Sequence, residues 1–257
     1  MSQWHEFVDT LATTEHERMT LMERVFDPIS VRNLDRLGVG PGWRCLEVGA
    51  GGGSVARAMA ERVGGRNVVA TDLSTILLGP LTELGVTVLR HDVLVDEAPG
   101  TFDLIHARYV VDHLPDRETA IRRLVSWLKP NGVLLIEAGT TLPELSSRRA
   151  TKLAMEAGNA ALATNLGTDN SWARTLPGPL WAAGLTGCAA EATAPPVIGG
   201  SPMATWLRAS YQLLGDKILD TGLLGRDDLD AAYASYSDPS FVDYTWLTVS
   251  AWGRKTS

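Results

Sequence analysis

The amino-acid sequence predicts an α/β fold built on a mostly parallel sheet. Between residues 42 and 138, short apolar segments of strand length alternate with segments of helical periodicity, as in consecutive βαβ units. The first apolar segment runs into a glycine-rich turn, C-L-E-V-G-A-G-G-G-S, at residues 45–54, and a helical stripe of Val55, Met59 and Val63 follows. A strand, a glycine turn and a helix open a nucleotide-binding unit, because glycines let the backbone turn sharply and approach a ligand closely.

Composition restricts the class of protein further. The 257 residues suit one α/β domain with additions, and no stretch approaches the ~20 apolar residues of a membrane span. Residues 1–14 show no signal-peptide pattern. The formal charge of −7 disfavours a nucleic-acid groove, which is usually basic. Cys45 and Cys188 fit neither a disulfide framework nor a metal spacing, so we expect a cytoplasmic protein without a metal.

Three helical pieces are expected before the first strand. Trp4, Phe7, Val8 and Leu11 form one stripe, and Glu17–Phe26 forms a second helix. Asp27 and Pro28 resemble an N-cap and first-turn pair that starts a third helix, which ends near Leu37. Residues 1–40 exceed what the fold needs, so they form either a lid over the ligand or a packing element.

The glycine turn is followed by three further strands. The second, Asn67–Asp72, ends in an acid roughly 20 residues after the turn, where a ribose-binding carboxylate is expected. The third strand is Val86–Arg90. The fourth, Phe102–His106, continues toward Tyr109. Open α/β sheets bind ligands at the carboxyl ends of such strands.

The second half of the chain alternates less regularly. Asp116 is expected to cap a helix that stops at the breaker cluster Lys129–Gly132, before a fifth strand at Val133–Ile136. Helical patterns then dominate, with one further strand and a final antiparallel edge strand. The expected elements are helices at 146–164, 172–185, 207–218 and 229–236, a sixth strand at 186–194 and the last strand at 244–252.

Two motifs resemble those of a known family. The pattern E-x-G-x-G-x-G from Glu47 to Gly53, and L-K-P-N-G-V-L-L-I at 128–136, look like signatures of the class I S-adenosylmethionine (SAM)-dependent methyltransferases. The resemblance spans about residues 42–138. It implies a Rossmann-like fold with a seven-stranded, mostly parallel sheet, an antiparallel edge strand and a helical cap. It also implies one domain over 1–257, with a lid at 1–40, a SAM-binding core at 41–140, and cap insertions and the last strands at 141–257.

The resemblance assigns cofactor contacts as well. An acid near the turn, Glu47, suits the ammonium of the methionine part, Asp72 suits the ribose hydroxyls, and Asp92 suits the adenine amino group. The full expected set for SAM, or its product S-adenosylhomocysteine (SAH), is Glu47, Gly49, Ala50, Gly51, Gly53, Asp72, Leu73, Asp92, Val93 and Arg108.

The chain also looks like an actinobacterial branch of small-molecule methyltransferases that often acts in secondary metabolism, including antibiotic biosynthesis. That implies a small-molecule acceptor as partner, and the assembly it allows is a homodimer. Trp4, Trp172, Trp181 and Trp206 lie in the expected cap, where they suit an apolar acceptor or pack between helices. Such enzymes often carry a second acid after the fifth strand, whereas Glu137 is followed here by Ala138.

Methyl transfer needs alignment of nucleophile, methyl and sulfur, and needs a base only if the nucleophile arrives protonated. His113 is the nominated base and Tyr109 an orienting hydroxyl, although His113 also suits a packed helix start. His5 and His16 are weaker candidates. Two rivals keep the fold: a cyclisation or rearrangement without methyl transfer, and a non-catalytic SAM-binding partner. Glu47 and Ser54 disfavour a nicotinamide oxidoreductase, whose fingerprint ends in glycine or alanine.

Overall fold

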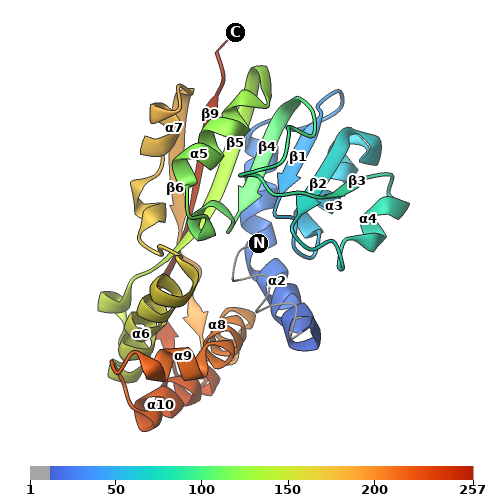
Figure 1. Cartoon of the computed structure of the whole chain (residues 1–257). Helices are drawn as coiled ribbons and strands as arrows, with labels where there is room; N and C mark the ends of the chain where they lie inside the picture. Colours follow the sequence, from blue (N-terminus) through green and yellow to red (C-terminus); the bar gives the residue numbers. More distant parts are fainter. Residues whose placement is uncertain (1–11, 257) are drawn as a thin grey trace.

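A seven-stranded sheet forms the centre of the protein (Figure 1), in a computed structural model that describes residues 12–256. The strand order is β3-β2-β1-β4-β5-β9-β6. β9 pairs antiparallel with β5 and with β6, and the other strands are parallel. The strands are β1 (Cys45–Val48), β2 (Val68–Asp72), β3 (Thr87–Arg90), β4 (Phe102–Arg108), β5 (Leu128–Thr141), β6 (Thr186–Thr193) and β9 (Trp246–Arg254).

The mostly parallel sheet with one antiparallel strand is confirmed, but the antiparallel strand does not lie at the edge. β6 pairs with the outer side of β9 and takes the edge position itself. Alternation along β9 could not reveal this, because an edge strand and its inner neighbour can carry the same period-two pattern.

Helices cover both faces of the sheet. Cys45 and Leu104 pack on the face that carries α3, α4 and the end of α2, whereas Leu46 and Ile105 pack under α5 and α7. The helices are α2 (Ala12–Arg36), α3 (Ser54–Val63), α4 (Gly79–Glu83), α5 (Arg117–Ser126), α6 (Arg149–Leu166), α7 (Gly178–Ala182), α8 (Pro202–Leu213), α9 (Gly215–Asp220) and α10 (Arg226–Ser237).

Helices α6, α8, α9 and α10 form a separate group beyond one end of the sheet, at the lower left of Figure 1. They share a core with Phe26 and Ile29 of α2, so the N-terminal helix belongs both to the sheet and to this cap. A two-stranded ribbon of β7 (Val197–Ile198) and β8 (Val242–Asp243) joins the group.

Helix α2 corrects one expectation. Residues 17–37 do not form two helices, because α2 runs unbroken through Pro28 to Arg36. The missing N–H of a mid-helix proline costs one backbone hydrogen bond, and here buried Phe26, Ile29 and Asn33 anchor the helix on both sides of it. Asp27 does not cap a helix start. The stripe of Trp4 to Leu11 lies outside the described residues.

Two smaller boundaries also differ from expectation. The helix expected to stop at Lys129–Gly132 already ends at Ser126, and Lys129–Gly132 belongs to strand β5, with Asn131 in the left-handed region at φ 64°. The pattern over 207–218 predicts one helix, whereas the chain breaks between α8 and α9 at Leu214.

Candidate active site

The glycine turn adopts a conformation that side chains oppose. Gly49, Gly51 and Gly53 have φ values of 65°, 55° and 88°, in the left-handed region that favours glycine. A Cβ at Gly49 would also collide with Val110, which follows β4. The turn is fixed by the Ala50 N–H, which donates to Thr71 O at 2.9 Å. The turn therefore lies between β1 and α3, with Met19 and Glu23 of α2 packed against Gly51 and Gly52.

Two acids stand at the ends of neighbouring strands beside this turn. Asp72, at the end of β2, accepts the Gly51 N–H at 2.8 Å through Oδ2 and the Ser74 N–H at 3.0 Å through Oδ1. Asp92 follows β3 and accepts the Leu94 N–H at 2.9 Å. The carboxyl edge of the sheet thus presents two oriented carboxylates.

A cavity of about 320 Å³ opens at this edge. The sheet supplies one wall, α2 supplies Met19 and Met22, and α6 and α8 close the far side with Leu162 and Leu207. Nine of the expected site residues line it: Gly49, Gly51, Asp72, Leu73, Asp92, Val93, Arg108, Tyr109 and His113. Glu47, Ala50 and Gly53 do not line it.

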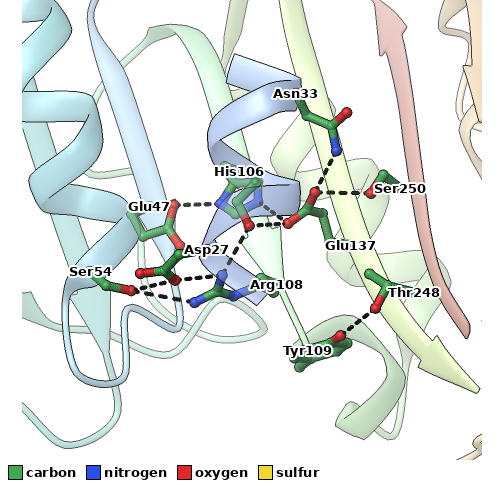
Figure 2. Close-up of polar contacts among 11 residues, drawn as sticks. Asp27, Asn33, Glu47, Ser54, His106, Arg108, Tyr109, Glu137, Thr248 and Ser250 are labelled. Carbon is green, nitrogen blue, oxygen red and sulfur yellow. Dashed lines mark hydrogen bonds and ion pairs between the residues drawn. The ribbon is translucent and has the colours of Figure 1, made fainter. Parts of the chain in front are cut away.

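Glu47 instead belongs to a buried polar row under α2 (Figure 2). Its carboxylate lies 2.7 Å from Nδ1 of His106, whose Nε2 lies 3.3 Å from Glu137. Glu137 also accepts hydrogen bonds from Ser30, from Asn33 at 2.7 Å and from Ser250 at 2.9 Å. Adjacent strands β1, β4, β5 and β9 each place one of these side chains on the same face.

Charge in this row concentrates on His106 and Glu137. Burial opposes a charged imidazole, but the two carboxylates outweigh it and raise the pKa of His106 to about 9. Burial likewise opposes ionisation of Glu137, yet its bond from His106 and the Ser30 hydroxyl lower its pKa to about 2. Burial raises the pKa of Glu47, which has fewer donors. Glu137 is therefore the anion of the row.

Glu47 differs in position from the residues that line the cavity, and its role toward a ligand's ammonium group stays a prediction. The side chain is 2% exposed, and its carboxylate is engaged with His106 beneath the sheet edge rather than facing the cavity. Arg108 does line the cavity, but its guanidinium is bound to Asp27 at 2.9 Å and to Ser30 at 3.0 Å, so it also fastens α2 to β4.

The two nominated catalytic side chains differ in their surroundings. Nδ1 of His113 lies 2.9 Å from the Thr168 hydroxyl, a bond that orients the imidazole at the cavity wall. The Tyr109 hydroxyl points toward β9 and bonds Thr248 at 2.7 Å (Figure 2), so it does not orient His113. Burial raises the pKa of Tyr109 far above its usual value. Its ring packs edge-on against Phe26.

Comparison with known proteins assigns the family. The family model described as "Methyltransferase domain" matches residues 4–175, two thirds of the chain. The chain belongs to this methyltransferase family. A ubiquinone biosynthesis O-methyltransferase of Xanthomonas campestris is 34% identical over 111 residues, which are 40% of this chain and 46% of that protein. The chain thus matches about half the length of such relatives.

Two solved structures share the fold of this methyltransferase. Haemonchus contortus phosphoethanolamine N-methyltransferase 2, in complex with phosphomonomethylethanolamine and S-adenosylhomocysteine, has a TM-score of 0.64 at 18% identity, covering 100% of this chain and 61% of that one. The [4+2]-cyclase SpnF has a TM-score of 0.52 at 18% identity, covering 90% and 80%. At these identities the likeness establishes the fold.

The cavity of the methyltransferase fits an adenosyl cofactor. Gly49 and Gly51 line it, and the carboxylates of Asp72 and Asp92 stand at successive strand ends, where hydroxyl and amino donors can reach them. Within residues 12–256, no three His, Cys, Asp or Glu side chains are grouped as a metal ion would require. No helix in the described part of the chain is long and apolar enough to cross a membrane.

Sequence reasoning missed Asp112, which precedes His113. It is 3% exposed and lines the cavity, and its Oδ1 has no hydrogen-bond partner in the described chain. Burial raises its pKa, although the nearby His113 and Arg117 oppose the rise. The only signal for it was an acid beside the nominated base.

The cap residues were also identified only in part. Trp206 lines the cavity, whereas Trp172 and Trp181 do not, and Trp4 and His5 lie outside the described residues. His16 is exposed and does not line the cavity. Asn159 and Asn170 do line it, and they bond each other at 2.7 Å. No periodicity distinguished them from other polar cap residues.

Ala138 gives the missing second acid a physical reason. Its side chain is completely buried in the apolar core beneath α5, on the opposite face from Glu137. An acid there would enter that core rather than the cavity. In this structure the residue after Glu137 therefore serves core packing.

Proposed function

We propose that this protein transfers the methyl group of SAM to an O, N or C atom of a small, fairly hydrophobic metabolite. The observation that carries the proposal is one continuous cavity. It joins the glycine turn and Asp72 to an apolar wall formed by the cap helices, including Trp206 and Leu207. SAM, the methyl donor, would then lie at the sheet edge beside the metabolite that accepts the methyl group under the cap. The resemblance to the actinobacterial branch supports a role in natural-product biosynthesis, in the cytoplasm, with a homodimer as the proposed assembly.

The residues support a displacement driven mainly by alignment. Holding nucleophile and methyl group in line can supply roughly 7–11 kcal/mol of the barrier. SAM supplies an electrophilic methyl group on its sulfonium, and the chain orients the acceptor against it. His113, oriented through Nδ1 by Thr168, is placed to take a proton from an acceptor hydroxyl or ammonium through Nε2. The C–S bond breaks as the new bond to carbon forms, and SAH leaves uncharged at sulfur.

The cavity wall indicates a partly polar acceptor. Leu162, Leu207 and Trp206 provide apolar contact, while Asp112 and Asn159 add hydrogen-bonding groups on one side. A flat aromatic or alicyclic body with one or two polar substituents satisfies both. The name of the Xanthomonas campestris relative, an O-methyltransferase, favours oxygen as the methylated atom.

An acceptor screen tests the proposal. The purified protein is incubated with SAM and a panel of small phenols, aromatic amines and alicyclic alcohols, and SAH and products are followed by mass spectrometry. We expect equimolar SAH and a product heavier by one methylene unit. The Asp72→Ala variant, which should lose cofactor affinity, serves as the control.

The rival functions give different results in the same screen. A cyclisation or rearrangement gives an isomer of the starting compound without SAH, and this outcome would replace methyl transfer as the function. Tight SAH binding with no turnover of any panel member would favour a non-catalytic SAM-binding partner and contradict the proposal.

A further inference from the structure

The glycine motif offers an acid for one part of the cofactor, its ammonium group, and that acid does not line the cavity. In the strand order β3-β2-β1-β4, Asp92 follows β3 and Asp72 ends β2, so the adenosine part of SAM would lie on that side. The methionine part would then extend toward β1 and β4. The acid that the motif offers for its ammonium group, Glu47, is held by His106 beneath the sheet.

Another carboxylate lies against the glycine turn, although its side chain, Glu23, does not itself line the cavity. Glu23 of α2 reaches the glycine turn from above, and a Cβ built on Gly52 would collide with its carboxyl group. One helical turn earlier, Met19 sits against Gly51 in the same way and lines the cavity. The backbone N–H of Ser54, the first residue of α3, is close enough to lower the pKa of Glu23, although burial raises that pKa overall. Glu23 therefore touches the turn at the start of α3.

The carboxylate of Glu23 is incompletely satisfied. Its Oε1 is buried and has no hydrogen-bond partner among residues 12–256. Its charged neighbours are Asp27 on the same helix, Arg108 on β4, and His16. Arg108 already pairs with Asp27 at 2.9 Å. A buried carboxylate oxygen without a donor is costly, so the site favours a ligand that brings a cationic donor.

Side-chain contacts on α2 fix the position of Glu23 over the glycine turn. Asp27 accepts a bond from the Ser54 hydroxyl at 2.9 Å and pairs with Arg108. Deeper along the helix, Asn33 bonds the buried Glu137 at 2.7 Å. Asp27 and Asn33, both labelled in Figure 2, thus attach α2 to the rest of the protein on the C-terminal side of Glu23.

We propose that the carboxylate of Glu23, in place of Glu47, binds the ammonium group of the methionine part of SAM. The proposal rests on SAM as cofactor and is independent of the acceptor. Glu23 is then a binding residue supplied by the N-terminal helix, so a segment outside the glycine motif completes the cofactor site.

The test compares two ligands that differ only in that group. One is SAH, and the other is 5′-S-(3-carboxypropyl)-5′-thioadenosine, which is SAH without its amino group. Their affinities are measured by calorimetry for the wild type, for Glu23→Gln and for Glu17→Gln, an exposed acid on the same helix. We expect Glu23→Gln to weaken SAH roughly 10- to 100-fold, as loss of a charge-assisted bond would. The deaminated ligand should keep its affinity within about twofold, and Glu17→Gln should change neither.

A purely structural role for Glu23, as a cap on α3, predicts another pattern. Both ligands would then weaken equally in Glu23→Gln, and the ligand-free variant would melt at a lower temperature. Either an equal loss for both ligands or no loss for SAH overturns the proposal. Absence of SAH binding to the wild type itself would overturn the cofactor assignment along with it.

A measurement on the wild type alone covers the case in which the variant does not fold. Burial, and then Asp27, raise the pKa of Glu23, while Arg108 and His16 oppose the rise. Binding of an ammonium group lowers that pKa again, so SAH should displace a proton in mildly acidic solution. Calorimetry in two buffers of different ionisation enthalpy should show this release for SAH and none for the deaminated ligand. Equal release for both would contradict the proposal.

Discussion

Among the side chains of the buried polar row, we expect substitution of Glu137 to lower the free energy of unfolding most. The Glu137→Gln substitution removes the anion opposite a buried His106, and the new amide N–H₂ would face the donors of Ser30 and Asn33. Breaking a buried ion pair by removing one partner typically costs about 3–5 kcal/mol. For a chain of this length, that lowers the melting temperature by roughly 10 °C. Urea unfolding at pH 7 would measure the free-energy change.

Glu191→Gln is the matched control, because Glu191 on β6 also pairs with α2, through Arg32 at 2.7 Å, but at the surface. An exposed pair of this kind contributes at most about 1 kcal/mol. Similar losses for the two variants would refute the assignment of charge to the buried row.

The pH dependence of stability gives a second check. The pKa of Glu137 is lowered to about 2, so its stabilisation is present above pH ~4.5 and is lost as the pH falls toward 2. Glu137→Gln should flatten that acid limb.

Three further substitutions test the cavity. Asp72→Ala should weaken SAH binding at least about tenfold by calorimetry, since its carboxylate also positions the Gly51 N–H; unchanged affinity would remove its ribose role. His113→Ala should lower kcat about 10²- to 10⁴-fold with little change in SAH affinity, whereas a parallel loss of melting temperature would indicate packing. Asp112→Asn should raise the free energy of unfolding more at pH 8 than at pH 5. Its raised pKa means that ionisation destabilises the fold as the pH rises, and an equal change at both pH values would contradict this.

The half of the site that binds the adenosine part in our proposal could be predicted from residues that are close together in the sequence. The glycine turn, the acid that ends β2 and the acid after β3 each follow a strand directly, and parallel strands bring their carboxyl ends to one edge. Gly49, Asp72 and Asp92 therefore reach the cavity wall without any knowledge of long-range packing. The helix cap at Asp116 was likewise legible, because it bonds the Thr119 N–H three residues away at 2.9 Å.

Only the tertiary structure decided which side chains Glu47 and Glu137 contact. Period-two alternation places Glu47 on one face of β1, but it does not say which side chain of the next strand stands beside it. That depends on the pairing of Glu47 with His106, 59 residues later, and on Ser30 meeting Glu137 across 107 residues.

The same limit applies to the two helical elements that close the cavity. Helix α2 and the cap helices α6 and α8 share one core, in which Phe26, Met155 and Leu207 pack together. No local sequence pattern specifies that packing. The sequence by itself therefore determined the family, the sheet and the cofactor edge, because these depend on neighbours in the chain. Three features depend on residues that are neighbours in space but distant in the chain: the partner of Glu47, the position of Glu23 and the shape of the cavity wall formed by the cap. Only the tertiary structure therefore revealed them.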